Sequence, residues 1–271
     1  MRRSWFAAPY GLWMAMFTAL PLVFVVYFAF TDAGGAATAG NVVKFARPTY
    51  LNILGHSVYL AFLCTLICLL IGYPAAYILA SKDFSRSRTL FVMILLPMWM
   101  NFLLRTYAMM SLIEDSGIIN TLLRAMGLRP LEMIGTEGAV LFGMVYNFAP
   151  FMILPIHTAL KRMDERVIEA AEDLGANPAG VFLRVVLPLS VPGVISGITM
   201  VFMPAVTMFA LSRLLGSGMF MLFGDVIEQE YLAVNDWNFG SALSLIMMIL
   251  IIASIGLLNK ADPRRDGGGA W

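Results

Sequence analysis

The chain has 271 residues, of which 60% are hydrophobic and only 13% are charged, and its mean hydropathy is +0.81. Soluble domains are about 45–50% apolar and about 25% charged, so this excess of apolar side chains excludes a water-soluble particle of this size. The 18 basic and 17 acidic residues leave a net charge of +1, which gives no support for nucleic-acid binding, and two cysteines exclude a disulfide scaffold. Composition predicts a protein embedded in membrane lipid.

Six stretches are apolar and long enough to cross a bilayer, which needs about 20 residues per helix. In chain order they are residues 11–30, 57–80, 89–113, 138–160, 185–212 and 237–259. None alternates in polarity as the strands of an outer-membrane barrel do. We therefore predict an all-α integral membrane protein with six transmembrane helices. A cleavable signal peptide is disfavoured, because its apolar region has about 7–15 residues and the first stretch is longer.

The distribution of Lys and Arg predicts the orientation, because cytoplasmic loops are enriched in both. If the N-terminus is cytoplasmic, 12 of the 18 basic residues fall on the inner side. Both termini are therefore expected in the cytoplasm. We divide the chain into an N-terminal helix with its outer loop (residues 1–54), a domain of five helices (55–260) and a disordered tail (261–271). The two long outer loops, residues 114–137 and 213–236, have room for short helices.

The loop of residues 161–188 carries the most specific local signals. Asp164 is expected to cap a first short helix, because its carboxylate can accept from the free amides of the first turn. Gly175 stands where a glycine ends a helix, and Asn177 followed by Pro178 is typical of the start of another. The pattern predicts two short helices joined by a break before the fifth span.

The same loop resembles the EAA loop of binding-protein-dependent ABC importer permeases, E-A-A-x3-G-x9-I-x-L-P, with Val185 in place of isoleucine. The matching positions are Glu169, Ala170, Ala171, Gly175, Leu187 and Pro188. The resemblance implies a type I (MetI-like) permease fold in a bacterial inner or plasma membrane. It also implies that the loop is a coupling helix, which docks on a separate ATP-hydrolysing subunit.

The resemblance further implies an assembly. Its members would be a second homologous permease, two ATP-binding subunits and an extracytoplasmic substrate-binding protein. ATP and Mg would be held by the ATPase subunits and no cofactor by this chain, which contains no G-x-x-x-x-G-K-[ST] motif. The chain itself is expected to have no catalytic residues, because no Ser/His/Asp set or paired intramembrane carboxylate stands out.

Shorter motifs narrow the resemblance to the spermidine/putrescine subgroup, closest to its B-type permease subunit over roughly residues 5–260. They comprise residues 72–77, 96–107, 116–120, 143–146, 151–155 and 236–242. Permeases for other cargoes share the general pattern, so thiamine, ferric ion or a phosphonate stay open as alternatives. A stand-alone secondary transporter is a further alternative, but it predicts an intramembrane acid for ion coupling, and none of the six stretches contains one.

A path for polyamines needs acceptors for ammonium groups and aromatic faces for cation–π contacts. The candidates are Trp99, Asn101, Tyr107, Tyr146, Asn147 and Asp225. The alternative for the aromatic residues is an interfacial belt or packing, and for Asp225 it is a helix cap. Arg105 would repel a cationic substrate, so we assign it to gating or structure, with snorkelling to the outer face as a feasible position. Cys64 and Cys68 are expected to be buried free thiols, and no metal site is predicted.

Overall fold

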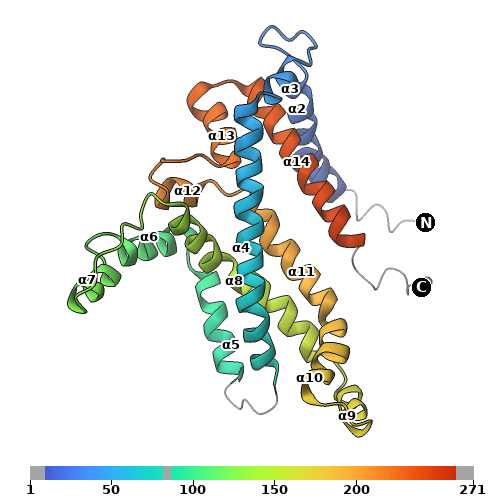
Figure 1. The fold of residues 1–271 in the computed structure, drawn as a ribbon. Helices are drawn as coiled ribbons and strands as arrows, with labels where there is room; N and C mark the ends of the chain where they lie inside the picture. Colours follow the sequence, from blue (N-terminus) through green and yellow to red (C-terminus); the bar gives the residue numbers. More distant parts are fainter. Residues whose placement is uncertain (1–9, 82–86, 261–271) are drawn as a thin grey trace, which may run out of the picture.

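The computed structural model describes residues 10–81 and 87–260, and apart from one isolated bridge between Thr31 and Ala37 its regular elements in these ranges are helices (Figure 1). Five helices in these ranges are long and apolar enough to cross a membrane, and a pair of helices bent at a short break would make a sixth if the two count as one span. The predicted all-α class is confirmed, and the predicted six spans compare with five continuous ones and this bent pair. The predicted tail, residues 261–271, lies outside the described residues.

The first span covers Tyr10–Ala29 and ends in helix α2 (Leu20–Ala29), which follows a π-helical turn at Ala15–Ala19. A short helix α3 (Gly40–Phe45) then leads to α4 (Pro48–Ala80). Helix α4 begins before the predicted position 57, because Pro48 occupies the first turn, where a missing N–H costs nothing. With 33 residues it is about 50 Å long, more than a bilayer core requires. The proposed division at residues 54 and 55 falls inside α4.

The third predicted span is not one continuous helix. It consists of α5 (Ser87–Leu95), a 3₁₀ turn (Leu96–Trp99) and α6 (Phe102–Ile113), followed by α7 (Ile118–Ala125). The two halves meet at an angle of 102°. In Figure 1, α5 runs alongside α4, whereas α6 and α7 turn away from the bundle.

The break has a local cause. Pro97 lies in the 3₁₀ turn and Met100 is extended, so the helix cannot continue through this segment. Asn101 then starts α6, because its side chain accepts hydrogen bonds from Leu103 N at 2.9 Å and Leu104 N at 3.3 Å. An average of hydropathy does not reveal that a helix starts at Asn101, because the residues on both sides of it are apolar.

The second half of the chain contains two further long helices joined by the coupling-loop segment. Helix α8 (Glu137–Lys161) is followed by α9 (Glu165–Asp173). The next span runs without interruption over Pro178–Val206 and comprises α10 (Pro178–Val181), a π-helical turn (Phe182–Val186) and α11 (Leu187–Val206). The fifth span therefore begins before the predicted residue 185 and ends before the predicted residue 212.

Short helices fill the connection to the last span, as they do the one that contains α7, which confirms that the two long connections contain short helices. They are α12 (Ala210–Leu215), α13 (Phe223–Gln229) and a π-helical turn (Glu230–Val234). The last span is α14 (Trp237–Lys260), which packs against α2.

The core lies where α4, α8 and α11 pack against one another. Two glycines let α11 approach α8 closely. A Cβ at Gly193 would lie 2.8 Å from Pro155 O, and one at Gly197 would lie 2.7 Å from Met152 Sδ. Cys64 and Cys68 of α4 are fully buried in this core, as predicted.

Candidate functional site

Helix α9 begins with the cap that the sequence predicts. Asp164 is extended and its Oδ1 accepts a hydrogen bond from Arg166 N at 3.0 Å. Glu165 lies in the first turn, where the partial positive charge of the helix N-terminus stabilises a carboxylate. The start of α9 is therefore set by residues within the loop itself.

The end of α9 is a Schellman motif. Gly175 has φ +82°, a backbone conformation that costs glycine little. Its N–H donates to Glu172 O at 2.8 Å, and Ala176 N donates to Ala171 O at 3.1 Å. Asn177 then caps the next helix by accepting from Gly180 N at 2.7 Å. The break between the two helices is thus a hydrogen-bonded turn of defined geometry.

Helix α9 is exposed to solvent along its length. None of its residues is buried, and Glu169 and Ala170 are exposed. Leu174, at its C-terminal end, has 89% of its surface exposed, and Val167 has 44%. The surface of α9 is therefore accessible to a partner along its whole length.

The six predicted coupling residues fall into two groups. Glu169, Ala170, Ala171 and Gly175 lie on α9 and its C-terminal turn, whereas Leu187 and Pro188 form the first turn of α11. A cavity of about 570 Å³ separates α9 from the end of α4. It is lined by Glu169 and Glu172 on one side and by Tyr77 and Ser81 on the other.

The predicted path residues are not brought together in one place. Trp99, Asn101 and Tyr107 are exposed on the broken third span, and Trp99 has 90% of its surface exposed. Tyr146, on α8, is 43% exposed, whereas its neighbour Asn147 is 1% exposed and donates to Gly143 O at 2.8 Å. Asn147 therefore points into the core.

Arg105 links the two halves of the broken span. It is 7% exposed, its Nη1 donates to Pro97 O at 2.8 Å, and its guanidinium lies 5.9 Å from the centroid of the Tyr146 ring. The Arg105 side chain therefore turns back across the break, toward the first half of the span. These contacts fit the structural alternative, since the guanidinium supplies a donor to a carbonyl at the end of the 3₁₀ turn.

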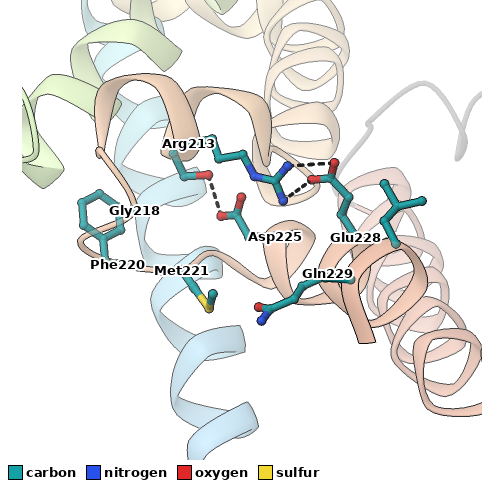
Figure 2. A pocket seen from close by; sticks show the side chains of 10 residues that line it. Arg213, Gly218, Phe220, Met221, Asp225, Glu228 and Gln229 are labelled. Atoms are coloured by element: carbon teal, nitrogen blue, oxygen red, sulfur yellow. Dashed lines mark hydrogen bonds and ion pairs between the residues drawn. The ribbon is translucent and has the colours of Figure 1, made fainter. Parts of the chain in front are cut away.

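Asp225 occupies a third location, in α13 (Figure 2). It is 5% exposed, and its Oδ2 accepts from Ser212 Oγ at 2.6 Å and from Leu222 N at 2.8 Å. Burial raises the pKa of this carboxyl above its usual value, although the two hydrogen bonds act in the opposite direction. The alternative role of Asp225, that of a helix cap, explains the hydrogen bond that Oδ2 accepts from Leu222 N.

Two interactions around Asp225 had no signal in the sequence. Ser57 of α4 accepts a hydrogen bond from Phe223 N at 2.7 Å, which fixes the start of α13 to a helix 166 positions away. Arg213 forms a two-point ion pair with Glu228, with N–O distances of 3.0 and 2.7 Å. Both contacts join residues far apart in the chain, and no local pattern predicts them.

Comparisons of the sequence with known proteins find one matching family and several similar permeases. The family described as "Binding-protein-dependent transport system inner membrane component" matches residues 69–266. The spermidine/putrescine transport system permease protein PotB of Haemophilus influenzae is 37% identical over 258 residues, covering 92% of this chain and 90% of that protein. PotB of Escherichia coli is 33% identical over 263 residues, covering 92% and 96%.

Solved structures share the fold. A crystal structure of a bacterial ABC transporter involved in the import of the acidic polysaccharide alginate superposes with a TM-score of 0.76 at 14% identity, covering 97% of this chain and 96% of the other. A complex of the bacterial alginate transporter with a pentasaccharide-bound periplasmic protein gives 0.74 at the same identity, covering 98% and 95%. The predicted family and fold class are confirmed: the chain belongs to the inner-membrane permeases of binding-protein-dependent ABC transporters.

Proposed function

We propose that the chain is the permease subunit of a polyamine importer and forms part of the path for spermidine or putrescine. The observation that carries this proposal is its identity of 37% and 33% to two permeases named for spermidine/putrescine transport, each matched over nine-tenths or more of its length. Thiamine, ferric ion and phosphonate are the alternative cargoes, and the experiment below includes them.

The assembly that we propose has four further components. A second, homologous permease would complete the path, two ATP-binding subunits would hold ATP and Mg, and a substrate-binding protein would deliver the cargo. The crystal structure of the alginate transporter with its periplasmic protein supports a partner of the last kind. Both termini and α9 would face the cytoplasm, in accord with the distribution of basic residues.

Coupling would proceed through α9. Its small Ala170 is exposed and lets another backbone approach, and Leu174 protrudes toward solvent. Because hydrogen bonds fix both ends of α9, a displacement imposed on it would pass to α8 and α11 as a rigid-body movement. ATP binding would bring the two motor subunits together, move the coupling helices and open the path outward, and hydrolysis would reset it.

The exposed aromatic side chains are the candidates for contact with the cargo. Trp99, Tyr107 and Tyr146 present ring faces that can receive an ammonium group, and Asn101 lies at the same break. Asn147 is assigned to packing, because it is buried and bonds within α8. Arg105 holds the break between the half-helices and is not assigned to cargo binding.

The proposal is tested by reconstituting the chain with its companion permease, ATPase and binding protein in liposomes that contain ATP. We expect saturable, ATP-dependent uptake of labelled spermidine and putrescine, with competition by other polyamines. Uptake of thiamine, ferric ion or a phosphonate, but not of polyamines, would retain the importer and reject the cargo. Uptake by this chain alone, without ATPase, would establish the secondary-transporter alternative.

Variants separate coupling from the path. Glu169→Lys should uncouple ATP hydrolysis from uptake while the chain remains folded in the membrane, because the reversed charge disturbs the contact through which α9 would pass on the movement of the ATPase. Glu169→Gln is its matched control, since it keeps the size of the side chain.

Trp99→Ala and Tyr146→Ala should weaken uptake more than assembly. Normal coupling in Glu169→Lys would reject the role of α9, and unchanged uptake in the aromatic variants would leave those residues with packing alone.

A further inference from the structure

A cavity of about 370 Å³ lies between α12 and α13, apart from the exposed aromatic residues of the proposed path (Figure 2). Apolar side chains make up much of its wall, among them Phe220, Met221 and Leu232. Its polar groups include Asp225, Gln229 and the paired Arg213 and Glu228. A mainly apolar cavity with a few convergent polar groups is typical of a small-molecule site.

Only one of the two carboxylate oxygens of Asp225 accepts hydrogen bonds from the protein. Both of its hydrogen bonds, from Ser212 Oγ and Leu222 N, reach Oδ2. Its Oδ1 is buried and has no hydrogen-bond partner among the described residues. An unpaired buried carboxylate oxygen is costly, and the capping contact that Asp225 makes from the third position of α13 needs one acceptor oxygen only. The helix cap therefore does not explain why a second, buried oxygen is present here.

Two charged side chains beside the cavity act on this carboxylate: Arg213 attracts it and Glu228 repels it. Arg213 lines the same cavity, but its Nη1 donates a hydrogen bond to Glu228 Oε1 and its Nη2 forms an ion pair with Glu228 Oε2. That two-point pair fixes the guanidinium and neutralises it. The formal charge that remains in the cavity is that of Asp225, which an incoming cation would balance.

We propose that this cavity is a subsite for one ammonium group of an aliphatic amine, with Asp225 Oδ1 as its hydrogen-bond acceptor. The apolar wall would cover the methylene groups that follow the ammonium in such a molecule. A magnesium ion fits less well, because it needs near-octahedral coordination by oxygen and retains its waters. The proposal rests on the proposed polyamine function, and in the orientation proposed above the subsite faces the outside, where cargo arrives.

Protection of a single introduced cysteine measures binding directly. Leu232 lines the cavity and is 77% exposed, whereas the natural cysteines are fully buried in α4. In the purified importer complex, Leu232→Cys should react with a water-soluble maleimide, and spermidine or butane-1,4-diamine should slow that reaction. Magnesium chloride at equal ionic strength should not. The measurement uses neither ATP nor binding protein, so it does not depend on transport.

Two carboxylate variants identify the acceptor. Leu232→Cys with Asp225→Asn should need about tenfold more amine for the same protection, because an ionic hydrogen bond is replaced by a neutral one. Leu232→Cys with Asp236→Asn is the matched control: Asp236 also caps a helix, accepting from Phe239 N at 3.0 Å, but it does not line this cavity. Glu228→Gln should also weaken protection, since it releases Arg213 to compete for Asp225.

The outcomes separate the subsite from the cargo. Protection that needs Asp225 but not Asp236 establishes the subsite, and equal protection by magnesium or in Asp225→Asn overturns it. An unchanged labelling rate without amine shows that Asp225→Asn retains its fold. If polyamine uptake occurs in liposomes without protection, the cargo stands and the subsite is rejected. If protection occurs without polyamine uptake, the subsite stands and the proposed cargo fails.

Discussion

Helices α9 and α13 are both short connectors between spans, at opposite ends of the molecule (Figure 1), but they are held in different ways. Helix α13 has four buried residues, and its start is bonded to Ser57 of α4 and, through Asp225, to Ser212 of α12. Helix α9 has no buried residue and is defined by its own caps. The fold of the chain itself fixes α13, whereas α9 is left free to contact another protein.

This difference predicts that α13 contributes mainly to folding and α9 mainly to function. Isolated helices of fewer than about 12 residues are marginally stable in water, and α9 has 9. Its caps and a partner must therefore supply what packing supplies for α13. Substitutions in α13 should act on the stability of the permease, and substitutions in α9 should act on coupling.

The largest effect is expected for Gly224→Ala, at about 3 kcal/mol of the free energy of unfolding. A Cβ at residue 224 would lie 2.6 Å from Thr207 O, and a backbone carbonyl cannot move aside as a side-chain end can. Thermal unfolding of the purified permease complex measures the loss. Gly175→Ala is the matched control: its Cβ would meet no atom within 4 Å, and its strain is confined to the positive φ at the end of α9. Equal destabilisation by the two substitutions would contradict the distinction between the helices.

The same contrast explains which parts of the structure could be predicted from the sequence. Every group that caps α9 lies within a few positions of its partner, so Asp164, Gly175 and Asn177 could be identified from spacing alone. The contact between Ser57 and Phe223 joins distant segments, and only the packed bundle brings them together. The same reason applies to the candidates for the substrate path. Residue type predicts that a side chain can bind substrate, but the direction in which Asn147 or Asp225 points depends on the packing of the bundle.

The third span shows a second limit, that of hydropathy. Residues 89–113 are apolar enough to predict one helix, and the bend of 102° within them depends on three local features. Pro97 limits the first half, Asn101 caps the second, and Arg105 bonds the carbonyl at the junction. These signals were present in the sequence, but an average over about 20 residues conceals them.

A smaller effect, of about 2 kcal/mol, is expected for Leu174→Asp in the binding of the proposed ATPase subunit. Loss of an anchoring side chain from an interface typically costs this much binding free energy, which corresponds to about 30-fold in affinity. Surface plasmon resonance with immobilised ATPase measures the change, and thermal unfolding of the permease should be unaffected because Leu174 is 89% exposed. Unchanged affinity would remove Leu174 from the docking surface, and a large loss of stability would show that α9 packs on its own chain.

The smallest effect is expected for Asp164→Ala, which removes the cap of α9. Loss of such a cap costs about 1 kcal/mol, or about fivefold in the population of the folded helix. Since no buried residue of α9 offsets the loss, the helix should fray at Arg166, whose N–H loses its acceptor. We expect the ratio of polyamine uptake to ATP hydrolysis to fall by that factor, with unchanged thermal unfolding of the complex. Asp164→Asn keeps an oxygen at the same position and should retain coupling. If both variants lose coupling equally, the charge of Asp164 and not its cap would be the relevant property, and α9 would owe its conformation to the ATPase instead of to its own sequence.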